Sequence, residues 1–249
     1  MDLLGEGQTP ALFHITHWKA GSQWVKSILR ECFPNRFVDA QIGITKVRDF
    51  VKSPKSEGLI YPALYITKEQ FDSMVFPKNW YCFVIIRDLR DTLISAYFSF
   101  KISHPLLSKY NVDLRDKLNS LDMDDGLLYL MDTWLHAYAR IQESWLRSDF
   151  EVIRYEDLLT DDLMIFERIL IERCHMPITK EELKEVVLKN RFESTSGGRR
   201  LGEEKVDSHL RKGIPGDWRN YFNENIKRAF MKPFGDLLVK TGYEPSLDW

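Results

Sequence analysis

The sequence has few cysteines and no long apolar segment. Its three cysteines, Cys32, Cys82 and Cys174, are odd in number, widely spaced and form no CxxC motif, which argues against a disulfide framework. No apolar run approaches the roughly 20 residues that span a bilayer. The N-terminus has Asp2 and Glu6 where a signal peptide is basic and then apolar. We therefore expect a cytoplasmic protein in a reducing compartment, with no membrane partner.

Net charge is also nearly absent. The 35 Lys and Arg residues oppose 37 Asp and Glu residues, a formal charge of −2, so no global field attracts nucleic acid. Local basic pairs at Arg199-Arg200 and Arg211-Lys212 suit a small anion better than a polymer. No His, Cys and acidic residues have metal-ligand spacing, so we expect no metal site.

The order of apolar segments predicts an α/β protein. We find no internal repeat, and 249 residues suit a single domain, 1–249. Strand-like runs alternate with helical periods, which predicts a central, mainly parallel sheet flanked by helices. Strands are expected at 11–16, 80–86 and 150–154, with short ones possible at 37–38 and 59–61. Helices are expected at 23–31, 68–74, 91–100, 124–147, 162–173, 180–190 and 224–241, the last kinked or split at Pro233.

Residues 14–31 predict a strand–loop–helix cradle for an anion. The strand ends at Thr16, Lys19 and Gly21 lie in the loop, and the helix follows. The first N–H groups of a helix have no internal partners and point toward such a ligand. The order differs from a Walker A motif because the lysine precedes the glycine. Taken alone, an ordinary turn with a surface lysine explains the segment equally well.

Two further segments carry positive charge at expected ligand positions. The buried strand at 80–86 leads into Arg87 at the carboxyl edge of the sheet, where α/β proteins bind ligands, and Ser95 follows eight residues later. This strand end is either solvated or functional, and a functional alternative makes Asp88 a magnesium ligand. Late in the chain, Arg211-Lys212-Gly213 forms a second anion clamp. Two clamps suit a ligand that is phosphorylated at two places.

In combination these segments resemble the PAPS-dependent sulfotransferases, the cytosolic type and its bacterial relatives. The family loop Thr-Tyr-Pro-Lys-Ser-Gly-Thr-Thr-Trp matches residues 16–24 at its Thr, Lys, Gly and final Trp. The family arginine with a serine eight residues on is present, and Arg-Lys-Gly-x-x-Gly-Asp-Trp stands intact at 211–218. A strand followed by Tyr-Glu-Asp recurs at 152–157. These matches keep their order over residues 11–222.

The resemblance implies a P-loop-like sulfotransferase fold and transfer of a sulfuryl group from PAPS to a hydroxyl or amine of a small-molecule acceptor, with release of PAP and no required metal. It implies that loops near 40–76, 100–125 and 194–213 cover the acceptor. It assigns the nucleotide to the following residues: Lys19, Ala20, Gly21, Ser22 and Gln23 at the 5′-phosphate, Trp24, Tyr155 and Phe192 at the adenine, and Arg87, Ser95, Arg211, Lys212 and Gly213 at the 3′-phosphate. The resemblance also implies that Lys19 contacts the transferring group.

The family's catalytic histidine is missing. Its Lys-Thr-His stretch aligns with Tyr61-Pro62-Ala63, so another group must accept the proton or the acceptor needs little help. His17 and His104 are the candidate bases. An amine, which is nucleophilic when neutral, would lower the need for one.

Two other functions stay open. A P-loop-type small-molecule kinase would use ATP and magnesium, but the chain lacks the Lys-Ser/Thr pair after the glycine. A protein that binds PAP without transfer would explain the missing histidine. The sequence leaves open the acceptor and the oligomeric state.

Overall fold

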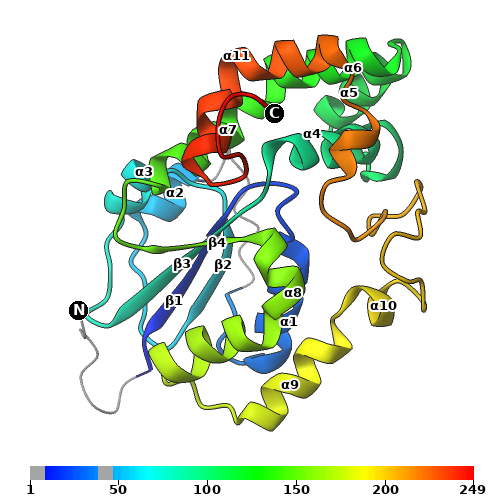
Figure 1. Ribbon diagram of the computed structural model, residues 1–249. Helices are drawn as coiled ribbons and strands as arrows, with labels where there is room; N and C mark the ends of the chain where they lie inside the picture. The colour runs from blue at the N-terminus through cyan, green and yellow to red at the C-terminus, as the bar shows by residue number, and fades with distance from the viewer. Residues whose placement is uncertain (1–8, 39–46) are drawn as a thin grey trace. The chain divides into compact units, whose positions relative to one another are not determined.

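The computed structural model describes residues 9–38 and 47–249, which fall into two compact units (Figure 1). The first unit consists of the described residues up to Ile86 together with Ile141–Arg191. The second unit consists of Arg87–Arg140 and Phe192–Trp249. Residues 40–46 of the predicted 40–76 loop, like Asp2 and Glu6, lie outside the described residues. Within the described part of the chain, no helix is both long and apolar enough to cross a membrane.

A four-stranded parallel sheet forms the first unit. Its order is β2 (Ile60–Leu64), β1 (Ala11–Thr16), β3 (Trp80–Ile86) and β4 (Glu151–Arg154). Every neighbouring pair is parallel. The sequence prediction of a mainly parallel sheet is confirmed, and β1 and β3 have the predicted bounds. Since parallel strands need crossover connections, helices cover the sheet.

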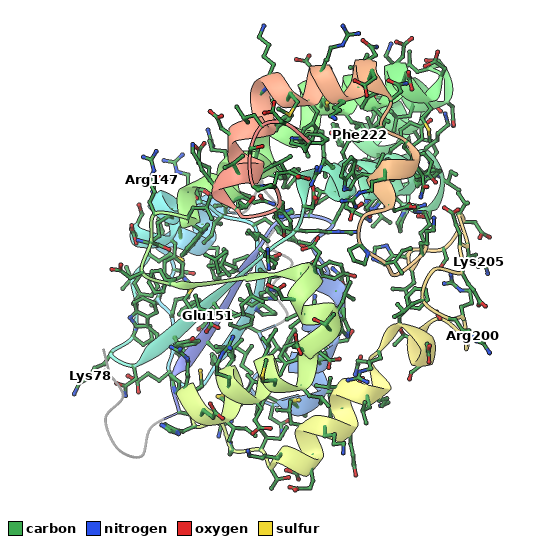
Figure 2. The ribbon with its side chains drawn as sticks, in the orientation of Figure 1. Lys78, Arg147, Glu151, Arg200, Lys205 and Phe222 are labelled. Carbon is green, nitrogen blue, oxygen red and sulfur yellow. The ribbon has the colours of Figure 1, made fainter. Side chains whose placement is uncertain are left out.

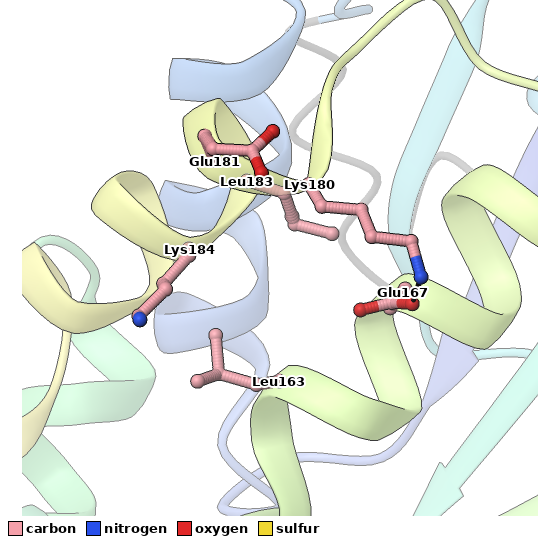
Figure 3. Close-up of a pocket in the computed structure, with 6 residues that line it drawn as sticks. All are labelled: Leu163, Glu167, Lys180, Glu181, Leu183 and Lys184. Atoms are coloured by element: carbon pink, nitrogen blue, oxygen red, sulfur yellow. Dashed lines mark hydrogen bonds and ion pairs between the residues drawn. The ribbon is translucent and has the colours of Figure 1, made fainter.

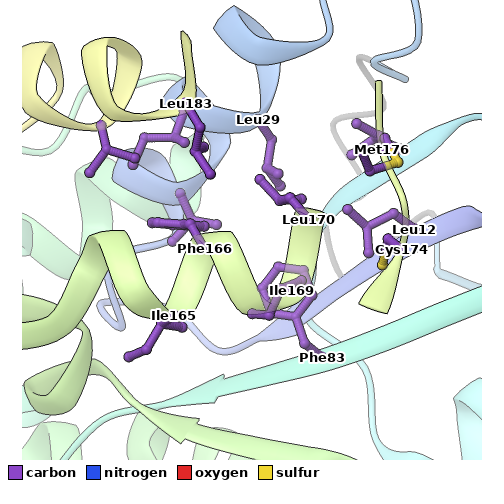
Figure 4. Packing of buried hydrophobic residues seen from close by; sticks show 14 of the residues in the cluster. Leu12, Leu29, Phe83, Ile165, Phe166, Ile169, Leu170, Cys174, Met176 and Leu183 are labelled. Carbon is purple, nitrogen blue, oxygen red and sulfur yellow. The ribbon is translucent and has the colours of Figure 1, made fainter. Parts of the chain in front are cut away.

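One face of the sheet packs against helices α1 (Ser22–Cys32), α8 (Tyr155–Phe166) and α9 (Lys180–Lys189). Leu12 and Phe83 point to this face and are fully buried among side chains of these helices (Figure 4). A π-helical segment, η4 (Glu167–Arg173), continues α8 and adds Ile169 and Leu170 to the same core. This core holds the start of α1 beside the ends of β1 and β3.

The opposite face carries an aromatic cluster. Phe13 stacks on Tyr61 at 5.0 Å between ring centroids and meets Phe71 edge to face at 5.7 Å. Phe71 belongs to α3 (Lys68–Asp72), which begins with a capping box at Thr67. Trp145 also packs on Phe71, and its indole N–H donates to the Ile66 carbonyl at 3.0 Å. A short α2 (Val47–Lys52) lies earlier in the chain. Many of the aromatic residues of this unit are therefore core residues.

The second unit is helical. Its elements are α4 (Leu89–Phe98), η2 (Ser99–Ser103), α5 (Lys109–Asn119), α6 (Met123–Leu130), η3 (Met131–Leu135), residues 136–140 of α7 (His136–Trp145), α10 (Phe192–Thr195), η5 (Asp217–Asn220) and α11 (Glu224–Lys240). The predicted helix at 124–147 corresponds to α6, η3 and α7 in succession.

Several predicted boundaries are wrong. The helix expected at 162–173 begins at Tyr155, directly after β4, and has non-helical angles at Asp161. The segment 100–125 contains η2 and α5, and 47–76 contains α2, none of which was expected, whereas β2 and α3 correspond to the strand expected at 59–61 and the helix expected at 68–74. Helix α11 is not split at Pro233. Residues 196–213 have no regular element, as predicted, and Arg200 and Lys205 extend outward from this segment (Figure 2). The predicted covering role of these segments stays a prediction.

Candidate functional site

The predicted 5′-phosphate loop joins the end of β1 to the start of α1. Thr16, the last residue of β1, donates its hydroxyl to the Ile85 carbonyl of β3 at 2.9 Å, which fastens the loop to the sheet. Lys19 has φ +67° and Gly21 has φ +76°, so the chain turns twice through the left-handed region. Gly21 is the N-cap of α1 and supplies no side-chain cap, and the first turn carries no acidic residue. The first N–H groups of α1 are thus free of side-chain competition for an anion.

Tyr155 lies directly over Gly21. A Cβ atom at position 21 would meet the Tyr155 ring at 2.5 Å, so only glycine fits beneath it. Trp24 lies edge to face with Tyr155 at 6.3 Å between centroids. The Trp24 indole N–H is buried and has no hydrogen-bond partner among the described residues. The structure thus brings together the two aromatic residues expected at the adenine and leaves a buried donor there.

The side chain of Ser22 accepts a hydrogen bond from Tyr65, the residue that follows β2. The Tyr65 hydroxyl donates to Ser22 Oγ at 3.0 Å, and burial raises the pKa of Tyr65 although this hydrogen bond opposes the rise. Tyr65 therefore stays a neutral donor, which leaves the Ser22 hydroxyl hydrogen available to another acceptor. Ala20 is fully buried and has no polar side-chain group, so it contributes only its backbone, whereas Gln23 is exposed.

His17 is held inside the loop by both ring nitrogens. Nδ1 lies 2.9 Å from the Trp18 carbonyl oxygen, and Nε2 lies 2.7 Å from the amide nitrogen of Gln142. These contacts fit a neutral ring that donates from Nδ1 and accepts at Nε2. Because His17 is fully buried, service as a base would require exchange of the Gln142 contact. Its catalytic assignment stays a prediction.

Ala63, predicted to stand at the position of the family histidine, lies in a β-bulge. Between β1 and β2 the register moves from Phe13–Tyr61 to Ile15–Leu64, so β2 has one extra residue. Ala63 takes φ +55° there, and its N–H donates to His14 Nδ1 at 3.3 Å. His14 is fully buried and stacked on Phe83, and burial lowers its pKa to about 3. His14 therefore satisfies the N–H that the bulge removes from the strand ladder.

The predicted 3′-phosphate residues all belong to the second unit. Arg87 follows β3. Burial raises the pKa of Asp91 in the first turn of α4, although the positive charge of Arg87 favours its ionisation. Ser95 is half-buried on α4. Asp88, the alternative magnesium ligand, is 5% exposed and accepts hydrogen bonds from Arg90 through both carboxylate oxygens. Among residues 9–38 and 47–249 no three metal-ligating side chains cluster.

The two cations of the second clamp are already paired with carboxylates. Lys212 Nζ lies 2.6 Å from Asp217 Oδ1, and Arg211 forms ion pairs with Asp217 and Glu204. Burial opposes ionisation of Asp217, but hydrogen bonds from Lys212 and Arg211 lower its pKa below the usual range. The Arg211 guanidinium also lies 4.5 Å from the centre of the Phe98 ring. These contacts hold both cations in one place before any anion binds.

Phe192 packs on the second clamp. A Cβ at Gly213 would meet its ring at 2.6 Å. The Arg199 guanidinium lies 5.1 Å from the centre of the same ring and donates to the Arg211 carbonyl at 3.0 Å. Phe192 thus belongs to the unit of Arg211, whereas Trp24 and Tyr155 belong to the other unit. Each unit therefore carries its own part of the predicted nucleotide site.

The second candidate base, His104, belongs to the second unit. His104 follows η2 and lies edge to face with Phe100 at 5.5 Å between centroids. A surface pocket between α8, η4 and α9 is lined by Leu163, Leu183, Lys184, Glu181 and the ion pair of Lys180 with Glu167 (Figure 3). It contains none of the predicted site residues.

Comparison with known proteins decides the family. The model of the sulfotransferase domain matches residues 10–242. The chain belongs to the sulfotransferase family. Human Sulfotransferase 2A1 is 26% identical, with 90% of this chain and 84% of the relative covered. A flavonol sulfotransferase-like protein of Flaveria bidentis is 24% identical, with 89% of this chain and 72% of the relative covered.

The fold is that of solved sulfotransferases. The crystal structure of mouse sulfotransferase SULT7A1 complexed with PAP aligns over 97% of this chain and 90% of its own, with a TM-score of 0.66 and 16% identity. The predicted P-loop-like sulfotransferase fold is thereby confirmed.

Sequence reasoning missed several residues that contact the predicted site residues. It gave His14 no role and did not consider Tyr65, Gln142 or Glu204. Asp217 lay inside the quoted 211–218 signature, but its pairing with both cations was not anticipated. An acidic residue five positions after a basic pair in a glycine-rich turn was the available signal. The other partners are remote in sequence, Gln142 by 125 residues from His17 and Tyr65 by 43 from Ser22.

Proposed function

We propose that this sulfotransferase transfers the sulfuryl group of PAPS to a hydroxyl or amine of a small-molecule acceptor and releases PAP. The observation that carries the proposal is the loop in which Lys19 and Gly21, both at positive φ, precede the uncapped start of α1. The family match over 10–242 supports it. The mouse relative was solved with PAP, which supports the choice of nucleotide.

The 5′ end of the nucleotide is assigned to the first unit. Backbone N–H groups of Gly21, Ser22 and Gln23 donate to the 5′-phosphate, and Trp24 with Tyr155 borders the adenine. PAPS supplies the sulfuryl group. Lys19 neutralises the charge that develops on the leaving oxygen, and because the loop is preorganised, this stabilisation needs no rearrangement during transfer. A lysine and oriented backbone donors serve this purpose without a metal ion.

The 3′-phosphate is assigned to Arg87, Ser95, Arg211, Lys212 and Gly213. Guanidinium groups bind phosphate oxygens bidentately, which suits a dianionic phosphomonoester. Arg211 and Lys212 already share Asp217, so this carboxylate keeps the cations in position and also competes with the ligand. Asp88 is held by Arg90, which disfavours the magnesium-dependent kinase.

The acceptor is proposed to need little help in losing its proton. Ala63 is assigned to the family histidine position, and His17 has both nitrogens engaged. Acidic hydroxyls such as those of phenols, and neutral amines, react without a strong base. One relative is named as flavonol sulfotransferase-like, and flavonols carry such hydroxyls. His104 stays the second candidate base. Binding of PAP without transfer is the alternative that Ala63 favours.

Calorimetry with PAP and ADP tests the nucleotide assignment. The 3′-phosphate should increase affinity, and Arg87→Ala should remove most of that increase. Equal affinities in the unaltered protein would contradict the proposal.

Turnover of PAPS with phenol, aliphatic alcohol and amine acceptors tests the transfer itself. Lys19→Ala should lower kcat by about 10²–10³-fold, as for loss of one preorganised oxyanion donor, with a smaller effect on PAP binding. Lys78→Ala is the control because Lys78 is an exposed lysine of the same unit. Tight PAP binding with no turnover on any acceptor would favour the binding protein.

A further inference from the structure

A buried arginine links α4 to the segment after α11. Arg90 is 1% exposed and donates to Asp88 through Nε at 3.0 Å and Nη2 at 2.7 Å. Its Nη1 donates to Glu244 at 2.5 Å. Burial disfavours its charge, but the hydrogen bonds that it donates to both carboxylates more than offset this and raise the pKa of Arg90. A buried guanidinium needs such complete pairing.

Two tryptophans enclose the same guanidinium. Its central carbon lies 3.9 Å from the centre of the Trp218 ring and 4.3 Å from that of Trp249. The two indoles meet edge to face at 5.2 Å between centroids. Arg90 therefore connects Trp218, in the 211–218 signature, with Glu244 and Trp249 beyond α11.

Asp91, the next residue of α4, binds the backbone of the 211–218 signature through its side chain. Asp91 accepts the Gly216 N–H at 2.6 Å and the Trp218 N–H at 3.0 Å. Asp217 lies between those residues, and its carboxylate binds Arg211 and Lys212. The position of both cations relative to α4 thus depends on Arg90 and Asp91. Arg87 precedes α4, so the same contacts also determine the position of Arg211 and Lys212 relative to Arg87.

We propose that Glu244 and Trp249 are positioning residues for the 3′-phosphate, acting through Arg90 and the 216–218 turn on Arg211 and Lys212. This inference rests on the proposed function. Their contacts with Arg90 and Trp218 lead to the 216–218 turn, so their effect is on placement. Loss of Glu244 leaves the buried guanidinium under-paired, and loss of the Trp249 ring opens one side of its enclosure. Either change shifts Trp218 and the Asp217 beside it.

The test measures how much affinity the 3′-phosphate adds. Dissociation constants for PAP and for adenosine 5′-monophosphate are measured by calorimetry for the unaltered chain, Glu244→Gln, Trp249→Leu and Trp249→Phe. Asp248→Asn is the matched control because it removes an exposed carboxylate from the same segment. Thermal unfolding establishes a temperature at which every variant is folded.

We expect Glu244→Gln and Trp249→Leu to reduce the ratio of the two constants about tenfold, as weakening of one charged hydrogen bond would. Adenosine 5′-monophosphate itself should bind within about twofold of the unaltered chain, a shift of under half a kcal/mol. Trp249→Phe keeps an aromatic face and should restore most of the ratio, and Asp248→Asn should leave it unchanged. Lower melting temperature with an unchanged ratio would show that the cluster is purely structural and overturn the inference. An unaltered chain that binds both nucleotides equally would instead contradict the proposed function.

Discussion

Replacement of Gly21 by alanine tests the packing of the phosphate loop most directly. Two separate penalties apply to the new methyl group. The residue must keep φ +76°, and its Cβ would lie 2.5 Å from Tyr155 Cε2 and 2.7 Å from Cδ2. The ring has to move for the loop to keep its shape, and Trp24, which packs on that ring, has to move with it.

The two penalties can be separated. The left-handed conformation costs an alanine about 1–2 kcal/mol. Overpacking adds about 1–3 kcal/mol, so Gly21→Ala should lower the free energy of unfolding by about 2–5 kcal/mol. Gly197 has φ +78° with nothing within 4 Å of the added Cβ, so Gly197→Ala carries only the backbone penalty. The difference between the variants isolates the contact with Tyr155.

Urea and thermal denaturation of both variants provide the measurement. In a protein of this size each kcal/mol shifts the melting temperature by about 2–4 °C. The double variant Gly21→Ala/Tyr155→Ala removes the obstructing ring, so the two substitutions should be non-additive, with the contact penalty absent. Equal destabilisation by Gly21→Ala and Gly197→Ala, or strict additivity with Tyr155→Ala, would refute the reasoning.

Two further predictions concern groups that sequence reasoning overlooked. His14 has a pKa of about 3 when folded and an ordinary value of 6.5 when unfolded, so between these values the unfolded chain binds more protons. Stability should therefore fall by about 1 kcal/mol per pH unit as the pH drops from 6.5 toward 5. His14→Gln keeps an acceptor for the Ala63 N–H and should flatten this slope, and a slope equal to that of the unaltered chain would contradict the assignment. Tyr65→Phe removes the donor to Ser22 and should destabilise the chain by about 0.5–1.5 kcal/mol in urea unfolding. It should also raise the KM for PAPS more than it lowers kcat, and a change in kcat alone would oppose the orienting role.

Local patterns in the sequence predicted the elements well where one physical signal dominated. The seven apolar residues of β3 form a strand that is buried over most of its length, and its bounds are those predicted from the sequence. The start of α8 was missed because its first turn, with Glu156 and Asp157, has no apolar period. Acidic residues in a first turn favour the helix dipole, a signal that the search for apolar periodicity does not register.

The sequence by itself determined the main strands of a parallel sheet, the loop with Lys19 and Gly21, and the two segments that carry Arg87 and Arg211. These depend on residues close together along the chain, where periodicity, turn chemistry and helix termini act. Only the tertiary structure decided how these groups are engaged. It pairs His17 with Gln142, places His14 at the bulge of Ala63, and shares Asp217 between both cations. A buried polar group must find a partner wherever packing brings one, and sequence distance does not constrain that choice.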